Sequence, residues 1–158
     1  MGTTEERIRA MGVDLPAPWC LPGSVHRAFD IVRVYRDTAY IAGHGPVDGE
    51  IIRMRGRVGD ELTVEDGYES ARLTAQAITA SLLRTIGDLD AITWLRSTVY
   101  VNAVADLAGP SLTRVGDGVS DFVNDAFGPP GHHARATIGV AALAFGVPTI
   151  VEATVALG

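Results

Sequence analysis

The order of apolar and polar residues predicts several β-strands in this chain. Loose alternation from Phe29 to Ala42, around a turn at Arg36-Asp37, predicts a β-hairpin. Asp48-Gly49 is a strong turn signal and predicts that another strand follows it. Segments rich in β-branched and aromatic residues give the remaining strands. The predicted strands after the hairpin cover residues 51–58, 94–104, 133–143 and 148–157.

Other segments carry the signals of helices. Thr3 and Glu6 form a capping-box pattern, which predicts a short helix over residues 3–11. Thr63 precedes a turn rich in acidic residues and an apolar stripe with helical spacing, which together predict a helix that ends at Gly87. A last helix is predicted over residues 111–127, because the glycine and prolines that follow it stop helices.

These elements predict an α+β fold with the order ββ(β)αβαββ after the short first helix. Strands outnumber helices, so we expect one sheet with both long helices packed on one face. The other face would then be apolar and uncovered, which predicts that self-association buries it. We divide the chain into an N-terminal helix with a proline-rich connector, residues 1–22, and one domain, residues 23–158.

Composition narrows the chemistry that the chain can perform. Its 158 residues are 47% hydrophobic and 20% charged, as expected of one globular domain. The net charge of −6 argues against a nucleic-acid partner, whose phosphates require neutralisation by basic residues. All 13 basic residues are arginine. The absence of lysine excludes every mechanism that needs a lysine Schiff base or a lysine base.

The sequence does not favour a metal site, a disulfide or a membrane-spanning segment. Cys20 is the single cysteine, so the chain forms no internal disulfide and no multi-cysteine zinc site. His132 and His133 are neighbours on a predicted strand and face opposite ways, so we expect no metal site and no cofactor. The N-terminus lacks the apolar core of a signal peptide, and no apolar stretch is long enough to cross a bilayer. We therefore expect a cytoplasmic protein without a membrane partner.

Four segments in the right order resemble one known family. They are residues 39–46 (AYIAGHGP), 97–101 (STVYV), 133–143 (HARATIGVAAL) and 151–153 (VEA). Through them the chain resembles the Rid family of reactive-intermediate deaminases, also called YjgF or L-PSP endoribonuclease proteins, and in particular its longer branch. The resemblance implies a chorismate-mutase-like fold with a mixed β-sheet and a homotrimer with pockets between subunits. The acidic charge makes ribonuclease activity the weakest functional reading.

The resemblance also implies a set of ligand-binding residues. Arg135 matches the arginine that binds the substrate carboxylate, a role that suits the two parallel donors of a guanidinium. Thr137 matches a pocket position and shares a strand face with Arg135. Gly43 matches a glycine whose backbone approaches the ligand. Phe29 falls where many members carry a pocket tyrosine, and Ser120 lies near the position of a pocket asparagine.

The last strand departs from the pattern of the active members of this family. Those members carry two acids there, and one of them holds or activates the hydrolytic water. This chain has Ile150 at that position and keeps only the second acid, Glu152, one rung further along the same face. Three explanations remain open. A shifted register brings Glu152 into the site, His44 or an acid from elsewhere replaces the lost group, or the protein binds a ligand without hydrolysing it.

Two functions follow as hypotheses. In the first, the protein binds small carboxylate metabolites and hydrolyses 2-imino or enamine acids to 2-keto acids and ammonia. The expected catalytic residues are then Arg135 and Glu152, and the expected ligand-binding residues are Arg135, Gly43, Thr137, Phe29, His44 and Ser120. In the second, the protein is a non-catalytic trimer that binds or senses metabolites after losing the water-activating glutamate.

Overall fold

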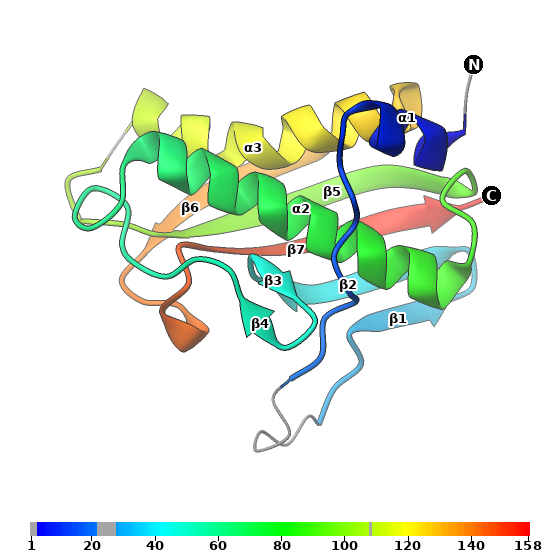
Figure 1. Ribbon diagram of the computed structural model, residues 1–158, viewed down its shortest axis with the longest axis horizontal. Helices are drawn as coiled ribbons and strands as arrows, with labels where there is room; N and C mark the ends of the chain where they lie inside the picture. The colour runs from blue at the N-terminus through cyan, green and yellow to red at the C-terminus, as the bar shows by residue number, and fades with distance from the viewer. Residues whose placement is uncertain (1–2, 22–27, 108) are drawn as a thin grey trace.

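A five-stranded mixed sheet forms the centre of the protein (Figure 1). The computed structural model describes residues 3–21, 28–107 and 109–158. The expected boundary between residues 22 and 23 lies outside the described residues. Strands β5 and β6 are parallel, and the other neighbours are antiparallel. Across the sheet the order is β1 (Val32–Tyr35), β2 (Thr38–His44), β7 (Thr149–Leu157), β5 (Ile92–Asn102) and β6 (Ala134–Val140). A separate two-stranded sheet contains β3 (Val47–Asp48) and β4 (Ile51–Ile52).

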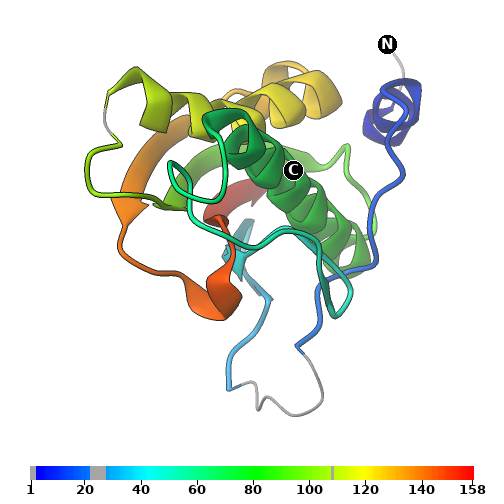
Figure 2. The same ribbon diagram turned by 60° about the vertical axis from the view of Figure 1, so that its left-hand side comes forward.

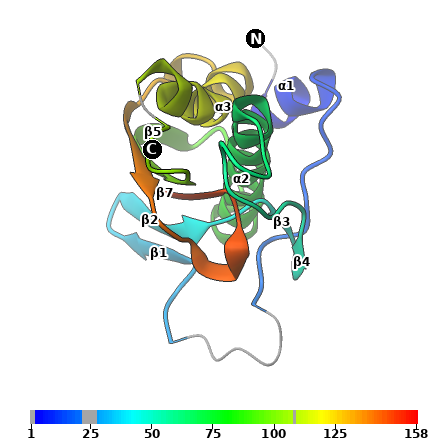
Figure 3. The same cartoon turned by 90° about the vertical axis from the view of Figure 1, so that its left-hand side faces the viewer.

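The two long helices cover one face of the large sheet, as the sequence predicts. They are α2 (Val64–Ile86) and α3 (Pro110–Phe127), and the turned views show them together on one side (Figures 2 and 3). The short helix α1 (Thr4–Ala10) lies against α3, and two 3₁₀ turns, η1 (Pro129–Gly131) and η2 (Ala144–Gly146), flank β6. None of the described helices is both long enough and apolar enough to cross a bilayer.

Helix α2 begins and ends at the residues that the sequence marks. The hydroxyl of Thr63 accepts a hydrogen bond from the backbone N–H of Asp66, and the Asp66 carboxylate accepts one from the backbone N–H of Thr63. At the other end Gly87 adopts φ 85°, a left-handed conformation that favours glycine. The predicted capping and the predicted stop are both confirmed.

The hydrophobic core fills the space between the helices and the sheet. Alternate residues of the central strands point into it, including Val99, Val151 and Val155, while Trp94 and Phe122 are its largest buried side chains. Alternation places every second strand residue on one face of the sheet. The side chains between these buried positions therefore lie on the face without helices.

The structure corrects two expectations about this architecture. The strand predicted over residues 51–58 ends at Ile52, because Arg55 and Arg57 donate to the carbonyls of Phe145 and Ala141 and hold the following segment as a loop. The face without helices is mixed at its centre rather than apolar, since Arg96, Thr98 and Glu152 line a hollow there together with Tyr40, Ile41 and Ala153. The expected apolar face came from counting strands against helices, and that count does not determine which side chains the uncovered face presents.

Candidate ligand-binding site

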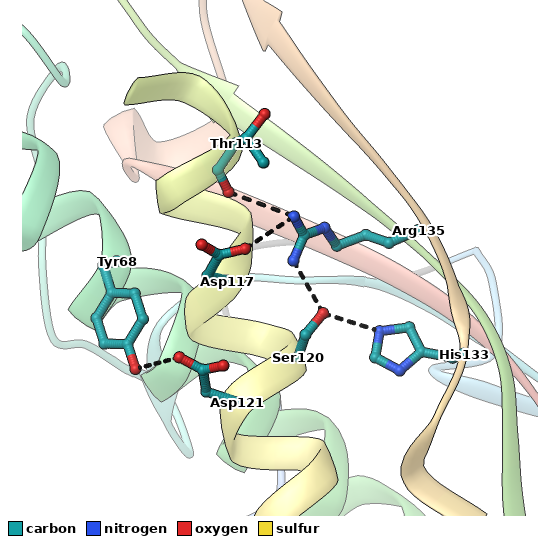
Figure 4. Close-up of polar contacts among 7 residues, drawn as sticks. All are labelled: Tyr68, Thr113, Asp117, Ser120, Asp121, His133 and Arg135. Atoms are coloured by element: carbon teal, nitrogen blue, oxygen red, sulfur yellow. Dashed lines mark hydrogen bonds and ion pairs between the residues drawn. The ribbon is translucent and has the colours of Figure 1, made fainter. Parts of the chain in front are cut away.

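Arg135 points from the edge strand β6 toward helix α3, where it meets a set of oxygen atoms (Figure 4). Its Nη1 donates to Oγ of Ser120 at 2.9 Å, and its Nη2 donates to Oδ1 of Asp117 at 3.0 Å and to the carbonyl of Thr113 at 3.3 Å. The Arg135 side chain is 16% exposed, and that of Asp117 is 39% exposed. One terminal nitrogen of this mostly covered guanidinium is thus held by a carboxylate and the other by a hydroxyl.

A glycine on α3 allows β6 and its side chains to approach the helix this closely. A Cβ at Gly116 would overlap Oγ1 of Thr137 and would lie 3.0 Å from Cζ of Arg135. The structure therefore brings Arg135 and Thr137 together on one strand face, as expected. The Thr137 hydroxyl is buried and has no hydrogen-bond partner among the described residues.

His133 extends this cluster by one further hydrogen bond. Its Nδ1 lies 2.7 Å from the carbonyl of Gly131, and its Nε2 lies 3.4 Å from Oγ of Ser120. The imidazole also packs on the indole of Trp94, with 5.7 Å between ring centroids. Burial lowers the pKa of His133 below its usual value, and the positive charge of Arg135 contributes in the same direction. Both effects favour the neutral form of the imidazole.

A separate apolar cavity of about 300 Å³ lies at the ends of β2 and β7. Phe29, Gly43 and Ile150 line it, so the structure brings these three expected site positions together. A Cβ at Gly43 would lie 2.8 Å from Cγ2 of Ile150, which shows how closely the two strands approach there. The other lining residues are Trp19, Cys20, Leu21, Gly45, Val47, Glu50, Ile52, Ala144, Phe145 and Val147. Among the described residues of this lining, Glu50 alone carries a charge, and its side chain is exposed.

Arg135 and the cavity do not meet within one chain. Arg135 pairs in register with Ser97, Ser97 with Ala153, and Ala153 with Ile41, so three strand spacings, roughly 14 Å, separate Arg135 from β2. Arg135 also faces α3, whereas Ile150 lies on the other face of the sheet from the buried Val151. The residues expected at the site thus fall into two halves, one around Arg135 and one at the cavity, and the two halves face different ways.

Glu152 belongs to neither half. It lies at the hollow on the open face, and the hydroxyl of Tyr100 donates to its Oε1 at 3.0 Å. This hydrogen bond is also the main reason why the pKa of Tyr100 is raised. Because Glu152 lies on the opposite face of the sheet from Arg135, one chain does not bring together the two residues expected to be catalytic.

His44 faces the core rather than a ligand. Its ring is fully buried, with Nδ1 2.7 Å from the carbonyl of Ala42 and Nε2 2.9 Å from Oγ of Ser81 on α2. The indole of Trp19 covers it at 5.2 Å between centroids, and burial lowers its pKa to about 4. The expected contact between His44 and a ligand is therefore corrected. That expectation came from the position of His44 beside Gly43 at the end of a strand, where the pairing of β2 with β7 is irregular between Ile41 and His44.

Sequence reasoning missed several residues that shape both halves. Asp117 holds Arg135, and its spacing of three from Ser120 on a helix was a usable signal, since such residues share a helix face. Trp19 and Phe145 reach the cavity from the N-terminal connector and from η2, and no local pattern indicates that. Within the described residues no three histidine, cysteine or acidic side chains gather closely enough to hold a metal ion.

Comparison with known proteins supplies relatives for both the sequence and the fold. Protein TCP17 of Trypanosoma cruzi is 30% identical over 99% of this chain and 95% of its own length. A candidate endoribonuclease of Shewanella oneidensis, solved as a crystal structure, superimposes with a TM-score of 0.89 at 23% identity, over 99% of this chain and 100% of the other. No protein-family model matches the chain.

More distant structures share the same fold. RidA from an Antarctic Psychrobacter species matches with a TM-score of 0.58 and 19% identity, over 92% of this chain and 97% of its own. Escherichia coli TdcF, solved with bound serine, matches with a TM-score of 0.60 and 17% identity, over 92% of this chain and 96% of its own.

Proposed function

Because this chain belongs to the Rid family, whose proteins are also called YjgF or L-PSP endoribonucleases, we propose that it binds small carboxylate metabolites through Arg135. The observation that carries the proposal is the guanidinium held between Ser120 and Asp117. The carboxylate of Asp117 occupies the position that a ligand carboxylate would take, 3.0 Å from Nη2. Since Asp117 is 39% exposed, it can turn to solvent and give up this contact without a large desolvation cost.

The two halves of the site face different ways, so we propose that a second copy completes it. In a homotrimer, the edge strand β6 of one subunit would lie against the cavity of the next. Arg135 would then anchor the carboxylate, and the apolar lining around Ile150 would receive the rest of the ligand. This arrangement favours 2-keto and 2-imino acids with apolar side chains, because a polar group would lose its hydration in such a cavity.

Hydrolysis of a 2-imino or enamine acid is the reaction that best fits this site. The carbon of a C=N bond is already electrophilic, so positioning and polarisation accelerate the attack of water without a covalent nucleophile. TdcF, which shares the fold, holds serine in its crystal structure, and serine is an amino acid with the same carboxylate group. The lack of lysine in this chain also agrees with non-covalent chemistry.

One observation favours the second candidate, a non-catalytic metabolite-binding trimer. Ile150 stands in the cavity where active members of the family carry an acid, and an alkyl side chain neither accepts nor relays a proton. Under this alternative the protein binds keto acids or amino acids and releases them unchanged.

Two measurements on the same variants test the proposal. Calorimetric titration with 2-keto acids should show binding that Arg135→Ala abolishes and Arg96→Ala retains, since Arg96 is an exposed arginine on the opposite face. Imines generated in situ, for example by an amino-acid oxidase, should yield keto acid faster with the wild type than without it. Binding without acceleration supports the non-catalytic alternative, and no binding to any carboxylate overturns the proposal. Sedimentation velocity then tests the trimer.

A further inference from the structure

The hydrogen bonds around Ser120 have a fixed direction. A carbonyl oxygen only accepts, so the contact of 2.7 Å with Gly131 requires that Nδ1 of His133 carry the proton. In a neutral imidazole Nε2 is then an acceptor, and the hydroxyl of Ser120 donates to it. Arg135 has donors only, so it donates to the oxygen of Ser120. The chain of donors runs from Arg135 through Ser120 to His133.

This arrangement makes the Ser120 oxygen unusually able to pass on a proton. A guanidinium donor stabilises negative charge on that oxygen, and an imidazole acceptor stands ready for its proton. Ser120 and His133 are both only partly buried, so their polar atoms lie close to the surface where a ligand on Arg135 would lie. Figure 4 shows the three side chains in one row between α3 and β6.

We propose that His133, acting through the hydroxyl of Ser120, accepts the proton of the attacking water and so replaces the acid that is absent at position 150. The inference rests on the proposed binding of imino acids at Arg135. The imine carbon is bonded directly to the carboxylate carbon, so a ligand anchored on Arg135 presents that carbon beside Ser120. The proton acceptor therefore comes from the same half of the site as the anchor.

The step balances without a further reactant. The water oxygen bonds to the carbon of the protonated imine, and the C=N π electrons move to nitrogen. One water proton passes to Oγ of Ser120, while the Ser120 proton passes to Nε2 of His133. His133 later returns this proton through Ser120 to the amine nitrogen. The C–N bond then breaks, ammonia takes the remaining hydroxyl proton, and the 2-keto acid and an ammonium ion leave.

The charges around His133 give the reaction a pH dependence. Arg135 and His132 lie on its own segment, Asp117 of α3 lies on the other side of Arg135, and β5 packs the uncharged ring of Trp94 against the imidazole. Burial favours the neutral form of His133, whose Nε2 then has a free lone pair that can accept a proton. Its protonated form would point a donor at Ser120, which already receives one from Arg135. Activity should therefore fall on the acidic side as His133 becomes charged.

The decisive experiment compares keto-acid release over pH 5–9 for the wild type, His133→Gln and Ser120→Ala, with keto-acid binding measured on each. Loss of a general base lowers rates by about 100-fold or more, so both variants should lose that much turnover. Binding should change little in His133→Gln, whereas Ser120→Ala also removes a hydrogen-bond acceptor of Arg135, so its turnover is compared at saturating ligand. His133→Gln should also lose the acidic limb of the profile. Ser120→Thr keeps a hydroxyl and should retain activity. Asp121→Asn, next to Ser120 but bonded to Tyr68, is the matched control.

The outcomes separate this inference from the proposed function. If His133→Gln and Ser120→Ala turn over substrate as fast as the wild type, the relay is overturned. If only Glu50→Gln loses turnover, the general base is the acid at the cavity instead. Binding of keto acids without any turnover also overturns the relay, but leaves the carboxylate site standing. If a variant folds poorly, imidazole NMR of the wild type still tests the relay, because an Nε2-protonated tautomer of His133 at pH 7 would overturn it.

Discussion

His44 should make the folded protein sensitive to acid. Its imidazole is fully buried between α2 and Trp19. Nδ1 forms a hydrogen bond with the carbonyl of Ala42, and Nε2 forms one with Oγ of Ser81. Burial lowers its pKa from 6.5 to about 4. The folded state therefore favours the neutral ring, whereas the unfolded chain protonates it at the ordinary value.

The size of the effect follows from the difference between the two pKa values. Each pKa unit is equivalent to about 1.4 kcal/mol, so His44 contributes ~3 kcal/mol that acid removes. Above pH 6.5 this stability is fully present, because the ring is neutral in both states. As the pH falls from 6.5 toward 4, only the unfolded chain takes up the proton and stability is lost. Below that range both states are protonated and the loss stops.

Urea denaturation between pH 4 and 7, at constant protein concentration, measures this loss. His44→Gln keeps a donor and an acceptor in the buried site but does not titrate, so its free energy of unfolding should fall less than that of the wild type by ~3 kcal/mol. His132→Gln makes the same change at an exposed histidine and should follow the wild type. Carboxylates titrate in all three proteins and cancel in the comparison. Parallel curves for the wild type and His44→Gln would refute the reasoning.

Three further substitutions test the packing and the site. Gly118→Ala would drive a Cβ into the carbonyl of Tyr68, so chemical denaturation should show a free energy of unfolding lower by roughly 3 kcal/mol. An unchanged denaturation midpoint would contradict the close approach of α2 and α3. Gly116→Ala would drive a Cβ into Oγ1 of Thr137 and against Arg135, so keto-acid binding should weaken roughly tenfold in calorimetry, and unchanged binding would contradict the close approach of α3 and β6. Ile150→Glu places a carboxyl in the apolar cavity, where burial raises its pKa. That variant should lose stability as the pH rises. If the difference in melting temperature between variant and wild type is the same at pH 5 and pH 8, this reasoning is wrong.

Local sequence signals predicted the elements of the fold with few errors. Helix α2 begins at Thr63 and ends at Gly87 because the capping hydroxyl and the left-handed glycine act over a few residues. The hairpin of β1 and β2 turns at Arg36, as the alternation indicated. The error at residues 53–58 has a non-local cause. Arg55 and Arg57 donate to the carbonyls of Phe145 and Ala141, more than 80 residues away in the chain, so tertiary contacts hold that segment as a loop.

The net charge, the lack of lysine and the placement of Arg135 and Thr137 on one strand face follow from the sequence by itself, because composition and strand alternation are local properties. Only the tertiary structure decided which groups meet Arg135. Helix α3 crosses β6 at Gly116 and thereby delivers Asp117 and Ser120 to the guanidinium. The same packing joins His133 to Ser120, a contact that spacing along the chain does not reveal. Hydrogen-bond partners depend on where two elements cross, and that depends on the packing of the whole core.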